Sequence, residues 1–455
     1  MKNLGFKTKP VIFSLSAVCL AALIFWRVAD QSRTGFVSQA AVPAIAFEKF
    51  TLNNGLTVIV HEDHRSPSTA INLWYHAGTR NEPPGSHGIA HLSEHLMFTG
   101  TPRVTEDMAK VLKRMGITNA TASTDHDRTR VMMDVPETSF DAALRLVADL
   151  MAGTAEALTK EKVDKTRLEI EKEVARNNNS PYIAAEDLLR SRIYPADYPY
   201  ARHALRSIDG INSISLADVK EWFRTSYCPA NAVLVVAGDL NPQTVHRQVE
   251  QYFGGIEPGK ALSREQRPTP GAAPSKRETV MAKVPKPRLY MVWIVPGYAE
   301  PDIDRLDLLR HYLSLKIEEG LPPEKPEPEV DISLKSYELS GEFQIRLTAS
   351  TSEQLELLER EVKRQIDDVM SHGPAPAELE QIKTELLSSL SSDVEQIGGF
   401  GGKAGVLAIS EVFAGDPQHY RKAYQRMLET KPADLKAVSS RWLAAGPYVL
   451  KVKAE

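Results

Sequence analysis

Apolar and polar residues follow two different periods in the first part of the chain. Residues 47–64 (FEKFTLNNGLTVIVHEDH) alternate apolar and polar positions around Asn53-Asn54-Gly55, which predicts two short strands joined by a tight turn. Residues 68–78 (STAINLWYHAG) predict a third strand. Residues 86–98 instead have apolar residues at helical spacing and contain no proline, so we expect a helix there.

The order of predicted elements recurs in the second half of the chain. The first half continues with helices over 140–151 and 160–177 and a buried strand over 230–240. The second half has the same kinds of pattern in the same order: a strand over 289–297, a helix over 305–319, a strand over 343–350 and helices from Ser352 onward. The pattern predicts an α+β protein with two similarly folded domains, each a mixed sheet covered by helices.

Composition changes sharply between the two halves. Residues 254–288 are rich in proline, glycine and charge, which is typical of a surface linker. We therefore predict an N-terminal domain over 46–255, a linker over 256–288 and a C-terminal domain over 289–455. Residues 1–45 are expected to lie outside both domains.

The N-terminal segment has the charge-then-apolar order of an export signal. Lys2, Lys7 and Lys9 precede an uncharged run of sixteen residues over 11–26, which is shorter than the roughly 20 residues of a membrane-spanning helix. The small residues ending at Ala40 offer a cleavage site far from this run. The segment is expected to be either a cleaved signal peptide or an inner-membrane anchor, with the body in the bacterial periplasm in both cases.

Charge and cysteine content exclude two classes of protein. The 55 Lys and Arg residues nearly balance the 59 Asp and Glu residues, which gives no electrostatic reason to expect a nucleic-acid partner. The two cysteines, Cys19 and Cys228, exclude a disulfide framework. The hydrophobic core must therefore hold the fold.

Candidate chemistry lies on the helix predicted over 86–98. His91 and His95 are one helical turn apart, so both imidazoles can point at one metal ion, and Glu94 lies between them on nearly the same face. A catalytic zinc needs a third protein ligand, for which a carboxylate from elsewhere is expected. The alternative is a helix that carries three polar residues and no metal, but an otherwise apolar helix would make unpaired imidazoles costly to bury.

These residues resemble a known family. The order H-x-x-E-H within GTRNEPPGSHGIAHLSEHLMFTGT (78–101) is similar to that of the pitrilysin-like (M16) zinc metallopeptidases, the inverzincins. Further similar segments are NATASTDHDRTRVMMDVP, VDKTRLEIEKEVARNNNSP, YPYARHALRS and SYCPANAVLVVAGDL. The resemblance extends from Phe47 to the end of the chain and is weaker after the linker.

The resemblance implies roles for several residues. His91, His95 and Glu173 would bind one Zn²⁺ per chain and Glu94 would act as the base, with Glu171 as a rival third ligand. Asn119 and Ala120 would lie on an edge strand beside the metal, where a substrate peptide could add as a further strand; alternatively, Asn119 is a turn residue. The two domains would face each other as a clamshell around a chamber that admits peptides or unfolded segments. His76, His87 and His126 are expected to be surface or structural residues.

The second half departs from the family pattern. Active members, or their partner subunits, carry an arginine and a tyrosine there. In this chain Lys316 is the candidate to replace the arginine, and Pro323 falls near the position of the tyrosine, so the pair is expected to be absent. We therefore expect a homologous partner subunit to supply the missing pair. The leading hypothesis is a zinc endopeptidase; the alternatives are a non-catalytic structural or assembly subunit and a peptide-binding homologue.

Overall fold

The computed structural model describes residues 42–66, 68–202, 210–263, 269, 275–321, 328–399 and 401–455. Nearly all of the expected export segment lies outside these residues, so its role as signal or anchor stays a prediction. None of the helices described is both long enough and apolar enough to cross a membrane.

The first sheet contains the strands predicted around the Asn-Asn-Gly turn, where Gly55 adopts a positive φ of 89°. Its strand order is β1-β2-β6-β3-β5-β4, in which β2 and β6 are parallel and the other neighbours are antiparallel. The strands are β1 (Glu48–Thr51), β2 (Thr57–Glu62), β3 (Ser68–Tyr75), β4 (Asn119–Thr124), β5 (Thr129–Pro136) and β6 (Ala232–Gly238).

The second sheet repeats this topology. Its order is β7-β11-β8-β10-β9, again with one parallel pair, β7 with β11, among antiparallel neighbours. This order matches β2-β6-β3-β5-β4 of the first sheet strand for strand, so the predicted pair of similar α+β halves is confirmed. In the part of the chain that the structure describes, strand β1 is an extra strand that only the first sheet has. The strands are β7 (Arg277–Ala282), β8 (Arg288–Val295), β9 (Glu329–Ser336), β10 (Gly341–Thr348) and β11 (Tyr448–Ala454).

Strand β7 lies inside the stretch 256–288 that composition predicts to be a linker. The six residues RETVMA alternate between exposed and half-buried positions at the edge of the sheet. Their hydrogen-bonding partner is β11, at the other end of the second half. A short edge strand beside proline-rich sequence has little periodicity of its own, and a partner so distant in sequence adds no local signal.

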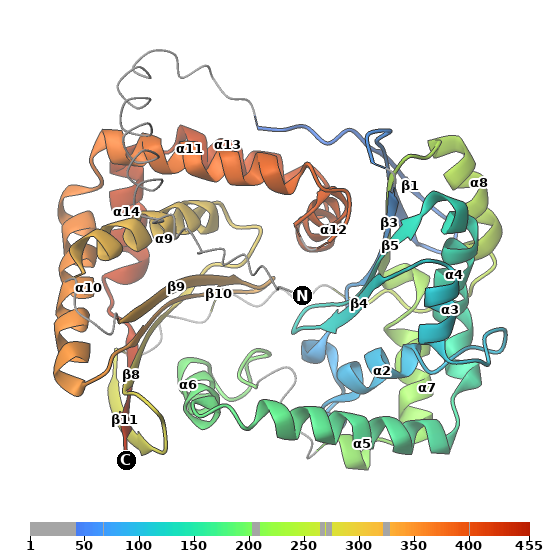
Figure 1. Cartoon of the computed structure of the whole chain (residues 1–455), viewed down its shortest axis with the longest axis horizontal. Coiled ribbons are helices and arrows are strands. Elements are labelled where there is room, and N and C mark those ends of the chain that lie inside the picture. The colour runs from blue at the N-terminus through green and yellow to red at the C-terminus, as the bar shows by residue number, and fades with distance from the viewer. Residues whose placement is uncertain are drawn as a thin grey trace, which may run out of the picture. The chain divides into compact units, whose positions relative to one another are not determined.

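Helices cover the two sheets and form a separate core with each (Figure 1). Those of the first half are α2 (Ile89–Met97), α3 (Met108–Arg114), α4 (Phe140–Ala157), α5 (Lys160–Asn177), α6 (Ile183–Ile193), α7 (Leu216–Thr225) and α8 (Pro242–Phe253). Those of the second half are α9 (Pro301–Gly320), α10 (Ser352–His372), α11 (Pro376–Asp393), α12 (Lys403–Ala414), α13 (His419–Glu429) and α14 (Pro432–Leu443).

Each half also contributes a helix to the sheet of the other half. Helix α12 packs against β3 and β6, where Leu407 shares a buried cluster with Trp74 and Val235. Helix α6 packs against β8 and β11, where Leu189 shares a cluster with Leu450. Figure 1 shows α12 beside the first sheet and α6 beside the second. This exchange covers the second face of each sheet and ties the halves into one fold.

Polar contacts reinforce the contact between α12 and the first half. Lys403 forms a buried ion pair with Asp63, and Lys49 Nζ lies 2.6 Å from Glu411 Oε1.

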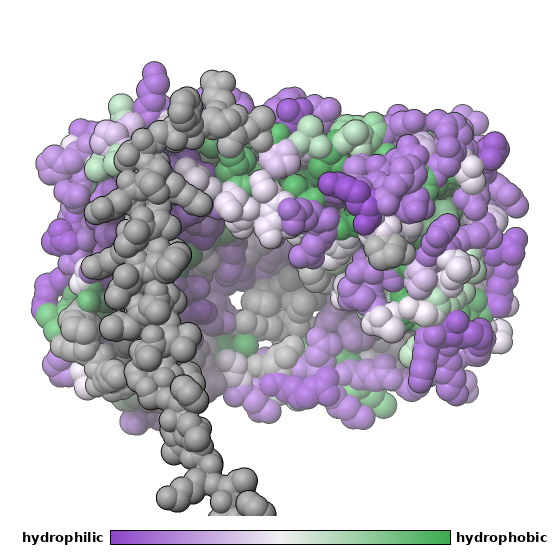
Figure 2. Space-filling model, turned by 45° about the horizontal axis from the view of Figure 1, so that its top comes forward, coloured by the Kyte–Doolittle hydropathy of each residue, from purple (hydrophilic) through white to green (hydrophobic). Residues whose placement is uncertain are grey.

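The surface of the protein carries few large apolar side chains, and the face in Figure 2 is mostly hydrophilic. Among the described residues, the large apolar side chains that are exposed are Leu168, Met281 and Leu357.

We predict that Leu407→Ala lowers the free energy of unfolding by about 2–5 kcal/mol, because it opens a cavity between α12 and the first sheet. Denaturant unfolding measures this change. The control is Leu357→Ala, at a helical side chain that is 49% exposed, which should change stability by less than about 0.5 kcal/mol. Equal effects for the two variants would contradict the role assigned to the exchanged helix.

Candidate metal centre

Helix α2 positions the H-x-x-E-H motif. It begins at Ile89, three residues later than the predicted range, because Gly88 adopts a left-handed conformation with φ of 93° at the N-cap. Glu82 in the preceding loop accepts hydrogen bonds from the backbone N–H groups of Gly88 and Ala90. Burial raises the pKa of the Glu82 carboxyl to about 7, although these hydrogen bonds favour its charged form.

The two histidines of α2 converge. His91 Nε2 and His95 Nε2 are 3.1 Å apart, and the two rings are nearly perpendicular. His91 is buried, and burial followed by the adjacent His95 lowers the pKa of its imidazole to about 4. His91 is therefore neutral near pH 7, which is the form that binds a metal.

Helix α5 brings the third group. Glu173 Oε2 lies 3.3 Å from His95 Nε2, and Glu173 Oε1 lies 3.8 Å from His91 Nε2. Ligand atoms at about 2.0–2.1 Å from a tetrahedral zinc are themselves about 3.3–3.4 Å apart. Two imidazole nitrogens and a carboxylate at these separations therefore fit a zinc site with an open fourth position.

The rival third ligand, Glu171, lies on another side of α5. Successive residues of a helix are rotated by about 100°, so Glu171 points away from the side that bears Glu173. Glu171 Oε1 lies 3.5 Å from Asn212 Nδ2, and Glu169 pairs with Lys165 at 3.8 Å. Of the three glutamates, the structure brings only Glu173 to the histidines.

Glu94 lies beside these groups without joining them. Its Oε2 accepts a 2.6 Å hydrogen bond from the hydroxyl of Thr124, at the end of β4. Burial raises the pKa of the Glu94 carboxyl, and the Thr124 hydrogen bond opposes this shift. Sequence reasoning missed Thr124, because a threonine thirty residues away from Glu94 belongs to no local motif.

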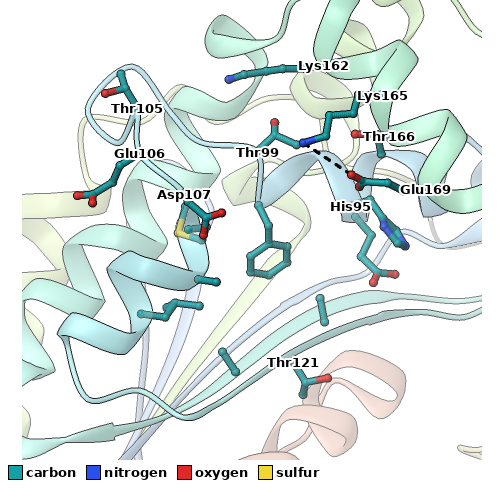
Figure 3. Close-up of a pocket in the computed structure, with 17 residues that line it drawn as sticks. His95, Thr99, Thr105, Glu106, Asp107, Thr121, Lys162, Lys165, Thr166 and Glu169 are labelled. Carbon is teal, nitrogen blue, oxygen red and sulfur yellow. Dashed lines mark ion pairs between the residues drawn. The ribbon is translucent and has the colours of Figure 1, made fainter.

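A cavity of about 750 Å³ opens beside the motif, between α2, α3, α5 and β4 (Figure 3). Glu94 and His95 line one side of it. The apolar residues that line the cavity are Phe98, Met108, Leu112, Ala120 and Ala122. Its charged residues come from α5 and from the loop before α3, and they are Glu106, Asp107, Lys162, Lys165 and Glu169.

Asn119 and Ala120 open strand β4, which is an edge strand of the first sheet. Ala120 lines the cavity, whereas Asn119 is exposed and donates a 2.6 Å hydrogen bond to Asp134 Oδ2 on β5. Asn119 therefore lies within a strand, which excludes its alternative role as a turn residue before one.

Three further histidines, His76, His87 and His126, have partners other than His91 and His95. His76 Nε2 is 2.5 Å from Glu338 Oε2, and His126 Nδ1 is 3.2 Å from the Thr79 hydroxyl. His87 contacts Arg202. None of them belongs to the group formed by His91, His95 and Glu173.

The charge of Lys316, in the second half, is not directed at the cavity beside the motif. Lys316 Nζ lies 2.9 Å from both Glu319 and Glu378, so its charge is neutralised within its own half. These hydrogen bonds raise the pKa of the Lys316 amine. Pro323, expected near the position of the family's tyrosine, lies outside the described residues.

Comparisons with known proteins agree with this architecture. The family model for Insulinase (Peptidase family M16) matches residues 57–205, and that for the Peptidase M16 inactive domain matches residues 213–386. A relative from Helicobacter pylori, "Zinc protease PqqE", is 26% identical over 412 residues, which cover 87% of this chain and 90% of the relative. The chain therefore belongs to peptidase family M16, whose zinc proteases it resembles over most of its length.

Solved structures share the fold. A protease from Helicobacter pylori superposes with a TM-score of 0.78 at 24% identity, over 90% of this chain and 100% of that one. The first half of the periplasmic protease PqqL from Escherichia coli gives a TM-score of 0.72 at 17% identity, over 90% and 93% of the two chains. Against full-length PqqL the match covers 91% of this chain and 48% of that one.

We predict that Glu173→Gln lowers zinc affinity more than about 10-fold, since a lost ligand should cost at least as much as a lost outer-shell partner. Competition against a chromophoric chelator measures this. The matched control is Glu171→Gln, two residues away on the same helix, which should bind zinc as the wild type does. The reverse result would move the third ligand to Glu171.

Proposed function

We propose that this protein is a zinc-dependent endopeptidase that binds one zinc ion through His91, His95 and Glu173. The observation that carries the proposal is the convergence of two imidazoles and one carboxylate, with Glu94 beside them. Zinc bound there would acidify a water molecule and polarise the carbonyl of a peptide bond. The zinc-protease name of the Helicobacter pylori relative supports the same metal.

Glu94 would be the general base. One of its carboxylate oxygens, Oε2, is oriented by the Thr124 hydroxyl, which leaves Oε1 to accept a proton from the attacking water. The same carboxyl can then deliver that proton to the departing amine. The role needs no covalent bond between enzyme and substrate.

The substrate would be an extended peptide or an unfolded segment. An extended chain can add to the edge strand β4, where Asn119 and Ala120 offer backbone hydrogen-bonding groups. The adjacent cavity would then accept one of its side chains. Membership of family M16 supports a closed, clamshell-like chamber that excludes compact proteins.

We predict that Glu94→Gln lowers kcat for a peptide substrate by about 10²–10⁴-fold, because the amide cannot take the proton, and leaves zinc content unchanged. The control is Glu161→Gln, at an exposed residue in the first turn of α5 that is not among the cavity-lining residues, and this variant should cleave peptides as the wild type does. Peptide-library cleavage and metal analysis give both measurements. Unchanged cleavage by Glu94→Gln would remove Glu94 from the mechanism.

We also propose that a homologous partner subunit completes the active site. Lys316 is held by Glu319 and Glu378 in its own half, which argues against it as a replacement for the arginine of active family members. Full-length PqqL is about twice as long as the part that matches this chain, which supports an assembly of two such units.

The proposed site of action is the bacterial periplasm, with residues 1–45 as a signal peptide or an inner-membrane anchor. The structural likeness to PqqL, a periplasmic protease, supports this location.

The partner proposal predicts that the purified chain alone binds zinc but cleaves peptides slowly. Adding a homologous subunit that carries the arginine and tyrosine should raise kcat. Light scattering would give the oligomeric state, and peptide cleavage the activity. Full activity as a monomer would show that no partner is needed.

A further inference from the structure

The first turn of α2 is held by groups from outside the helix. The first N–H groups of any helix lack acceptors within it, and Gly88 has no side chain to supply one. Glu82 supplies the acceptors instead. Its carboxylate oxygens each lie 3.0 Å from the Gly88 nitrogen, and Oε1 lies 3.2 Å from the Ala90 nitrogen.

The carbonyl of Ala90 is held from a second direction. The hydroxyl of Tyr227, a buried residue just after α7, donates a 2.9 Å hydrogen bond to Ala90 O. Ala90 directly precedes His91, and in an α-helix its carbonyl also accepts from the N–H of Glu94 four residues on. The backbone N–H of Ala90 is thus bound by Glu82 and its carbonyl by Tyr227, and both side chains lie outside α2.

A row of hydroxyl groups lies between the same tyrosine and the carboxylate of Glu94. The Tyr227 hydroxyl lies 2.8 Å from the Thr129 hydroxyl, which lies 3.3 Å from the Thr124 hydroxyl. Thr124 in turn donates to Glu94. Tyr227 therefore binds the backbone that carries the motif and packs beside the hydroxyl groups next to Glu94.

The segment that carries Glu82 is itself fixed. Two residues earlier, the nearly buried Arg80 pairs with Asp127 at 3.0 Å and with Glu338. Glu338 belongs to the turn between β9 and β10, so the second half takes part in this network. Because the ion pairs of Arg80 fix this segment, the Glu82 carboxylate can hold the first turn of α2 in place.

We propose that Glu82 and Tyr227 are positioning residues that set the direction of His91 and Glu94 by binding the first turn of α2. The inference rests on the proposed zinc site. Without these contacts the first turn of the helix frays, and His91 lies within that turn. An imidazole that is free to move binds the metal less tightly than one already in place.

Glu82→Met keeps the length of the side chain and removes both acceptors, and Tyr227→Phe removes only the hydroxyl. Each variant should bind zinc about 10–100-fold more weakly in chelator competition and should change the visible spectrum of the Co²⁺-loaded protein. Glu82→Gln retains an acceptor and should recover most of the lost affinity.

Two matched controls separate positioning from general stability. Thr351→Val removes the cap of α10, where the Thr351 side chain accepts from the Gln354 N–H at 3.2 Å. Tyr420→Phe removes a buried hydroxyl that binds the Ile45 N–H and the Pro43 carbonyl. Both should lower the melting temperature and leave zinc affinity and the Co²⁺ spectrum as in the wild type.

The outcomes distinguish this inference from the proposed function. A wild-type protein that binds no zinc overturns both. A wild type that binds zinc, with Glu82→Met and Tyr227→Phe matching their controls, overturns this inference alone. If Glu82→Met does not fold, the comparison of Tyr227→Phe with Tyr420→Phe decides the question.

Discussion

The packing of α2 against α5 is the constraint on which the candidate metal centre depends. His91 and His95 share one face of α2 through their spacing, but two imidazoles alone leave the site without its carboxylate. Glu173 reaches the two histidines because α5 lies alongside α2 and turns the side that bears Glu173 toward it. Both helices also line the cavity next to the motif, together with α3 and β4.

The duplicated topology gives this helix pair a counterpart with different chemistry. Helix α9 follows β8 as α2 follows β3, and α11 is the second helix after β10 as α5 is the second after β5. Where the first half has two histidines and a glutamate, the second joins its helices by the ion pair of Lys316 with Glu378. A salt bridge can hold two helices together, but a protonated lysine has no lone pair to offer a metal.

The two halves nevertheless depend on each other. Within the described residues, helices α6 and α12 each cover one face of the sheet of the opposite half. The turn that contains Glu338 also reaches Arg80, two residues before the carboxylate that caps α2. A half without the metal-binding motif can therefore still influence how that motif is held.

The sequence alone determined the features that depend on local spacing. A period of about four residues placed His91, Glu94 and His95 on one helix, and the patterns of apolar residues predicted strands β1, β2, β3, β6, β8 and β10. These patterns did not predict β5, β7, β9 or β11, and the partner of β7, strand β11, lies far from it in sequence. The exchange of α6 and α12 left no local pattern. Only the tertiary structure showed that Glu173 rather than Glu171 faces the histidines, and that Thr124, Glu82 and Tyr227 surround the motif. The physical reason is that hydrogen bonds and ligand geometry act over a few ångströms in space, whatever the separation of the residues along the chain.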